Sequence, residues 1–208
     1  MTEAVIFALL FAWFKGYKWS QIAKLFKHWS IYPIILTCLI HIYFISLMIH
    51  GQYWFLEYGK YVKLISVLFY FILILKYNLI DISVFQRFNK KGINQLYTSL
   101  TSPVVFGGIS TYIGSKLNKI AILYNCNKMP VFPSVSFGTG YSKIDMFEKA
   151  SLFKDFHVFG GYDTKLIFLT DVLDFFYVIM SVGDLLLRVF VVLILYYSIK
   201  QCNINNMG

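Results

Sequence analysis

Two oppositely charged residues, Asp184 and Arg188, interrupt the long apolar run 175–199. If this run is a helix, the two side chains lie one turn apart on one face, where a carboxylate and a guanidinium can pair. Ionised side chains are costly at membrane depth, so they usually pair, line a water-filled cavity or take part in function. This pair marks the region in which a site is expected, but it defines no reaction.

A second polar group lies in the apolar run 103–124, which contains Lys116, Asn118 and Lys119. In an antiparallel arrangement of the two runs, Asp184 falls near the depth of Lys119. We therefore predict a structural ion pair that involves Lys119, Asp184 and Arg188, with Lys116 as an alternative partner. Asn118 is expected to form a hydrogen bond between the helices. The simplest interpretation is a structural clamp, and the functional one is a ligand or proton site.

The composition predicts the elements that must position these charges. The 208 residues are 58% hydrophobic and 14% charged, whereas soluble domains are about 45–50% apolar and about 25% charged. We therefore expect an all-α integral membrane protein that forms one domain over residues 1–208. It would be a bundle of about five transmembrane helices with an ordered extracytoplasmic loop. The expected spans are 2–17, 29–49, 61–80, 103–124 and 175–199, and the outer loop is 125–174.

The net charge of +9 comes mainly from lysines in the short segments between these runs. The positive-inside rule then places the N-terminus outside the cell membrane and the C-terminus in the cytoplasm, with the basic segment Arg87, Lys90 and Lys91 inside. The lipid bilayer is the expected partner, together with a membrane or extracytoplasmic protein. A nucleic acid is not expected, because the charge does not form a basic face on a soluble module.

The outer loop contains several residues that could do chemistry. His157 and Asp171, together with Asp184, would supply the acid and base of a membrane-embedded enzyme if their side chains converged. The three cysteines are dispersed, so we expect neither a metal site nor a cofactor. The stretch 166–176 is too short to span and is expected to be re-entrant or interfacial. A small transporter is a further alternative, although the sequence shows no repeat.

Several short strings between 103 and 201 resemble a known family. They are Leu117-Asn118, Asn125, Lys128-Met129-Pro130-Val131, Asp163-Thr164-Lys165-Leu166, Phe168-Leu169-Thr170-Asp171 and Ser181-Val182-Gly183-Asp184. In order and spacing they are similar to the domain of unknown function (DUF) 5317 family of small bacterial multi-pass membrane proteins. This chain has Cys126-Asn127-Lys128 where the family has Gly-Gly-Arg, and Thr170 where it has Gly. The resemblance implies a membrane fold and no particular activity.

Combining the two lines of reasoning, we expect one polar cleft that opens to the extracytoplasmic side. It would bind a partner, a small ligand or a lipid headgroup, without catalysis in the leading hypothesis. Its predicted residues are Asn118, Lys119, Asn125, Lys128, Asp163, Asp171 and Asp184.

Overall fold

The computed structural model describes residues 2–27, 31–77, 79, 103–140, 142–143, 146–152 and 157–204. The predicted cytoplasmic residues Arg87, Lys90 and Lys91 lie outside these residues, as do parts of the predicted spans 29–49 and 61–80.

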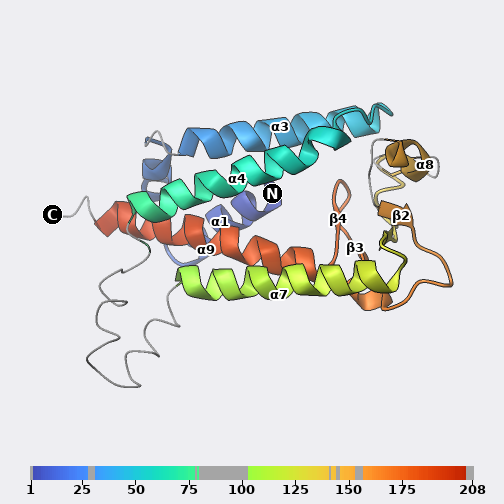
Figure 1. Ribbon diagram of the computed structural model, residues 1–208. Coiled ribbons are helices and arrows are strands. Elements are labelled where there is room, and N and C mark those ends of the chain that lie inside the picture. Colours follow the sequence, from blue (N-terminus) through green and yellow to red (C-terminus); the bar gives the residue numbers. More distant parts are fainter. Residues whose placement is uncertain are drawn as a thin grey trace, which may run out of the picture. The chain divides into compact units, whose positions relative to one another are not determined.

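The described chain is mainly helical, as the sequence predicted (Figure 1). Pro103 occupies the first position of its helix, where the missing N–H costs no hydrogen bond. The α-helices are α1 (Thr2–Phe14), α2 (Trp19–Ile22), α3 (Tyr32–Ile49), α4 (Leu56–Lys76), α7 (Pro103–Tyr124), α8 (Met146–Ser151) and α9 (Val182–Ile204), and the 3-10 helices are η1 (Ala23–Lys27) and η3 (Ile167–Leu169).

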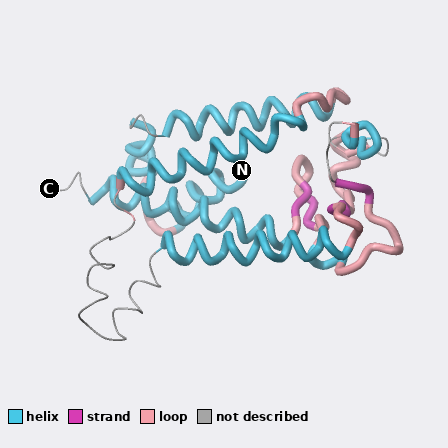
Figure 2. The backbone as a smooth tube through the Cα atoms, in the orientation of Figure 1, coloured by secondary structure: helices cyan, strands magenta, loops and turns pink. Residues whose placement is uncertain are grey.

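Short strands between α7 and α9 correct the purely helical prediction (Figure 2). Strand β1 (Met129–Val131) pairs in parallel with β2 (His157–Phe159), and β3 (Leu173–Asp174) pairs antiparallel with β4 (Ile179–Met180). A further bridge joins Val131 to Asp171. Strands of two or three residues are too short to show the alternation that identifies a strand in a sequence. The predicted re-entrant stretch 166–176 contains η3 and β3.

The last helix begins later than predicted. We expected a span from residue 175, but α9 starts at Val182 because the β3–β4 hairpin occupies the residues before it. This difference moves Asp184 from the middle of the expected helix into the first turn of the observed one.

The chain divides into two compact units, Met1–Cys38 with Ile65–Thr111 and Arg188–Gly208, and Leu39–Leu64 with Tyr112–Leu187. In the first unit, Ala4, Ala8 and Ala12 form a buried face of α1, where small side chains permit close packing. The second unit has two small apolar clusters, whose buried members are Tyr53, Val131, Met146 and Phe147 in one and Ala121, Met129 and Leu169 in the other.

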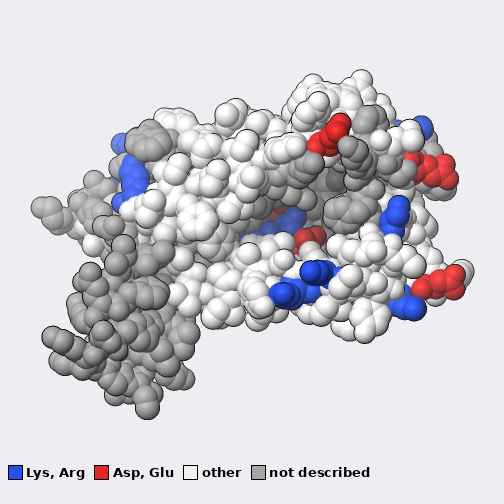
Figure 3. Space-filling model, viewed as in Figure 1, with Lys and Arg blue, Asp and Glu red and all other residues white. Residues whose placement is uncertain are grey.

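Two described helices, α3 and α9, are long and apolar enough to cross a membrane, which is weak evidence for membrane association. The surface also carries many large apolar side chains, including Phe14, Leu75 and Phe106. Figure 3 shows a face on which uncharged side chains dominate and charged ones form small, separate groups.

Candidate functional site

The position of Asp184 in the first turn of α9 helps to explain why a charged residue occurs in this apolar run. Ser181 precedes the helix, and its Oγ accepts a hydrogen bond from the backbone N–H of Asp184 over 3.0 Å. The Asp184 carboxylate accepts a longer one, 3.5 Å, from the backbone N–H of Ser181. These reciprocal bonds form a capping box, with aspartate in the place of the usual glutamate or glutamine. A carboxylate in the first turn is also favoured by the helix dipole.

Asn118 of α7 connects this helix start to the neighbouring helix. Its Nδ2 donates to Asp184 Oδ1 over 2.9 Å, and its Oδ1 accepts from the Ser181 hydroxyl over 2.7 Å. We call Asn118, Ser181 and Asp184 the capping cluster. A Cβ atom on Gly183 would overlap the Asn118 side chain and the Gly114 carbonyl, so the contact requires glycine. Small residues therefore permit close helix packing at this point.

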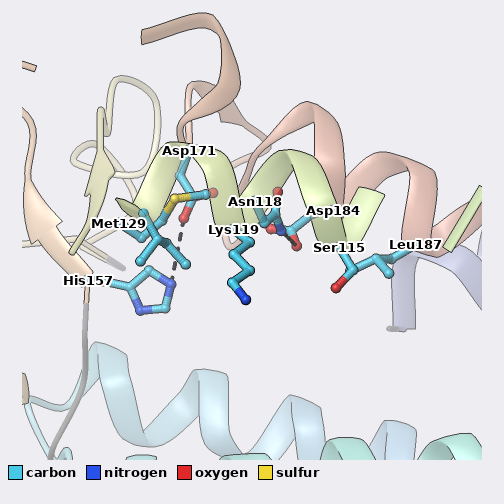
Figure 4. A pocket seen from close by; sticks show the side chains of 9 residues that line it. Ser115, Asn118, Lys119, Met129, His157, Asp171, Asp184 and Leu187 are labelled. Carbon is cyan, nitrogen blue, oxygen red and sulfur yellow. Dashed lines mark hydrogen bonds and ion pairs between the residues drawn. The ribbon is translucent and has the colours of Figure 1, made fainter. Parts of the chain in front are cut away.

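A pocket of about 380 Å³ adjoins the capping cluster within the second unit. Figure 4 shows that it receives side chains from α7, the strand region and the first turns of α9. Polar and charged groups dominate one part of its lining, and three apolar side chains complete it. The lining residues are Ser115, Asn118, Lys119, Ile122, Met129, His157, Asp171, Asp184 and Leu187.

Asp171 and His157 face each other across the pocket wall, with Asp171 Oδ2 at 3.7 Å from His157 Nε2. Asp171 is only 3% exposed. The backbone fixes its position, because its N–H donates to the Pro130 carbonyl and its carbonyl accepts from Phe132 N–H. His157 opens β2, whose parallel pairing with β1 places it opposite Met129. The buried carboxylate can therefore orient the half-exposed imidazole toward the pocket.

Lys119 supplies the positive charge of the pocket. It is exposed and lies one helical turn after Ser115, so both side chains project from the same face of α7. Figure 4 shows the Lys119 side chain extending into the open space that the His157 ring also faces. We refer to Ser115, Asn118, Lys119, His157, Asp171 and Asp184, together with the apolar lining, as the polar pocket.

The structure divides the predicted cleft residues into two sets. Asn118, Lys119, Asp171 and Asp184 line the polar pocket. Asn125 instead joins the end of α7 to the loop: it accepts a hydrogen bond from Lys165 N–H over 2.8 Å and donates to the Lys165 carbonyl over 2.9 Å. The described lining does not include Lys128 or Asp163, and both are exposed.

The structure describes contacts of Asp184 and Arg188 with residues other than those of the predicted ion pair. Arg188 Nε lies 3.7 Å from Glu3 Oε2 of α1, within the first unit. The hydrogen bond from α7 to Asp184 comes from Asn118, the neighbour of the predicted Lys119.

The sequence reasoning did not find Ser115, Ile122, Met129 or Leu187, and it placed His157 only in the enzymatic alternative. The spacing of Ser115 and Lys119 was an available signal, because residues four apart share a helical face. No local signal places His157 next to Asp171, since a parallel strand pair and an isolated bridge bring them together.

A third carboxylate, Asp174, is held by a different set of partners. Its Oδ2 accepts hydrogen bonds from the backbone N–H groups of Ser134 and Ser136, at 2.6 and 2.9 Å, and from the Ser136 hydroxyl. Burial alone would raise the pKa of this carboxyl, but these hydrogen bonds outweigh it and hold the pKa below its ordinary value. Asp174 thus fastens the loop before α8 to β3.

The turn after α7 has a left-handed backbone at two residues that are not glycine. Cys126 and Asn127 have φ angles of +56° and +59°, in the left-handed region that glycine adopts without cost. The two glycines of the family pattern occupy these positions. This chain keeps the turn with side chains that are less suited to it.

Comparison with known proteins supports the family resemblance. Neither a curated protein nor a solved structure matches the chain. The segment that matches a family begins with α7 and extends into α9, so it contains the capping cluster and every residue of the polar pocket. Residues 103–196 match the Family of unknown function (DUF5317), which confirms the resemblance predicted from the sequence.

Proposed function

We propose that this protein is a multi-pass membrane protein that binds a small polar ligand or a lipid headgroup in the polar pocket. The observation that carries the proposal is the meeting of Lys119, Asp171, Asp184 and His157 around one cavity of about 380 Å³. Ligand pockets of about 300–1,000 Å³ commonly combine an apolar lining with a few convergent polar groups. We propose binding without catalysis as the main activity.

Helix length supports the multi-pass part of the proposal. Helices α4 and α7 contain 21 and 22 residues, so at about 1.5 Å per residue each is as long as a hydrocarbon core of about 30 Å. With α3 and α9, and with α1 as a shorter helix of 13 residues, they would make five spans, with the N-terminus outside and the C-terminus in the cytoplasm. The polar pocket would then open to the extracytoplasmic side, with the bilayer around the helices.

The exposed thiol of Cys126 offers a test of this topology. A membrane-impermeant maleimide added to intact cells should label the wild-type protein and leave the Cys126→Ser variant unlabelled. Labelling of Cys126 only after permeabilisation of the cells would place the loop in the cytoplasm and reverse the proposed orientation.

Ligand binding can be tested with purified protein in detergent. The probes are inorganic phosphate, ethanolamine, glycine and phosphoethanolamine, and thermal unfolding is the measurement. At least one probe should raise the unfolding temperature of the wild type, because a ligand that binds only the folded state stabilises it. Lys119→Met should reduce this shift, whereas Lys128→Met should leave it unchanged because Lys128 lies outside the described pocket lining.

The binding proposal fails in either of two ways. In the first, no probe shifts the unfolding temperature, either in detergent or in nanodiscs. In the second, the Lys119 and Lys128 variants reduce the shift equally. In the second case the effect would reflect general surface charge and not the pocket.

The Asp171–His157 pair favours a second candidate, an enzyme that transfers a proton to or from its ligand. A carboxylate beside an imidazole is a common arrangement for an oriented general base. In that case His157→Gln should abolish turnover of a bound ligand while leaving its affinity within about twofold, because the lost group acts on the transition state. Equal loss of affinity and turnover would assign His157 to binding.

A further inference from the structure

We infer that the ligand of the polar pocket is a zwitterion, a molecule or headgroup that carries an ammonium group and an anionic phosphate or carboxylate group a few bonds apart. This inference rests on the proposed binding function and specifies its ligand class.

The anion side of the pocket is formed by α7. Within the described residues, neither Lys119 nor Ser115 has a hydrogen-bond or ion-pair partner, and both line the cavity from one helical face. The ammonium and the hydroxyl are donors, and the His157 ring faces the same space (Figure 4). Phosphate and carboxylate oxygens are the acceptors that such a set of donors binds best.

The cation side is formed by the two aspartates. The Asp184 carboxylate lines the pocket and accepts hydrogen bonds from the Asn118 amide and the Ser181 N–H. Asp171 is nearly fully buried beside the pocket. An ammonium group that entered between these carboxylates and the solvent would find acceptors of opposite charge.

The charged groups of the lining favour a ligand that carries both signs of charge. The lining includes one lysine and two aspartates, so a plain anion would approach Lys119 against the field of both aspartates. A plain cation would be attracted by the aspartates but would leave Lys119 without an anionic group. A zwitterion places each of its charges beside a group of the opposite sign, and Ile122, Met129 and Leu187 can contact its short carbon linker.

Phosphoethanolamine contains both groups, while phosphate and ethanolamine supply each half alone. In titrations of the purified full chain, we expect each half to bind at least about tenfold more weakly than phosphoethanolamine, because it forgoes one set of ionic contacts. If either half binds as tightly as the whole, the zwitterion inference is wrong, although binding itself would stand.

Two pocket variants separate the two charges. Lys119→Met should weaken phosphoethanolamine and phosphate, and it should leave ethanolamine unchanged or strengthened. Asp171→Asn should weaken phosphoethanolamine and ethanolamine more than phosphate, which depends on Asp171 only through the orientation of His157. Lys128→Met is the matched control for the lysine, and it should change none of the three. Equal weakening of all three probes by both pocket variants would contradict separate anion and cation sides.

The same chemistry occurs in a lipid headgroup and in free metabolites, and membranes distinguish the two. The protein is reconstituted into nanodiscs of phosphatidylglycerol with or without phosphatidylethanolamine. A headgroup site predicts that phosphatidylethanolamine raises the unfolding temperature and competes with soluble phosphoethanolamine. A site for a soluble ligand predicts that phosphoethanolamine binds equally in both membranes. Absence of any binding in either membrane and in detergent would reject the binding function together with this inference.

Discussion

The two pocket aspartates differ in what holds them, although both were predicted as members of one cleft. Asp184 is part of the capping cluster, in which Ser181 and Asn118 supply hydrogen bonds and Gly183 permits the close approach. Asp171 is held by its own backbone, and its side chain faces the imidazole of His157. The difference teaches that a charge in an apolar run can mark the start of a helix, whereas the carboxylate that faces an imidazole came from the loop.

The largest expected effect is on the capping cluster. Gly183→Val should lower the free energy of unfolding by about 3 kcal/mol, because the added carbons overlap the Asn118 side chain and the Gly114 carbonyl. Thermal unfolding in detergent measures it. Gly108→Ala is the matched control, since a Cβ there meets nothing within 4 Å. Equal stability of the two variants would show that the helices do not approach as described.

A pair of serine variants compares the capping cluster with the polar pocket directly. Ser181→Ala should cost about 1–2 kcal/mol, because it removes the helix cap and the hydrogen bond to Asn118. Ser115→Ala should cost less than about 0.5 kcal/mol, because that exposed hydroxyl faces the pocket. Chemical denaturation measures both changes. If Ser115→Ala lowers the free energy of unfolding more than Ser181→Ala does, the comparison is wrong.

Glycine substitutions in the turn after α7 should raise the free energy of unfolding instead of lowering it. Cys126→Gly should stabilise the protein by about 1 kcal/mol, because it relieves a left-handed backbone at a residue with a Cβ. Asn127→Gly should gain less, since asparagine tolerates this conformation better. Urea titration in mild detergent would measure both changes, and destabilisation by Cys126→Gly would argue that its thiol has a role that the turn does not explain.

The smallest effect concerns Asp174 and pH. Its pKa in the folded protein lies below the ordinary value of 3.8, so its contribution to stability is present above that value. It is lost as the pH falls through the lowered pKa, because protonation weakens the hydrogen bonds from Ser134 and Ser136. Between pH 7 and pH 3, the unfolding temperature should therefore fall slightly more in the wild type than in Asp174→Ala. If the unfolding temperature falls equally with pH in both proteins, the hydrogen bonds from Ser134 and Ser136 do not stabilise the ionised Asp174.

Much of the helical part followed from the sequence, because apolar runs of about 20 residues are long-range signals that need no tertiary information. Thr2–Phe14 and Pro103–Tyr124 fall within the expected runs. The start of α9 was also readable in principle, since Ser181 and Asp184 have the spacing of a capping box. The apolar character of 175–180 outweighed that local signal in the prediction.

The pocket could be predicted only in part. Asn118, Lys119, Asp171 and Asp184 were found because they are polar residues in or near apolar runs. His157 joins them through strand pairing between distant segments, and such pairing is decided by the whole fold and not by local sequence. Lys128 and Asp163 share the motif strings of these residues but lie on the exposed surface.

The parallel pairing of β1 with β2 also sets an order of assembly during synthesis. The chain leaves the ribosome from its N-terminus, so α7 and β1 are complete before His157, Asp171 and the first turn of α9 have been made. Contacts between segments far apart in sequence form slowly, because the intervening chain must first lose entropy. A nascent chain that ends before Ser181 would therefore present α7 without its partner, leaving Asn118 and the surface beside Gly114 uncovered until α9 is made.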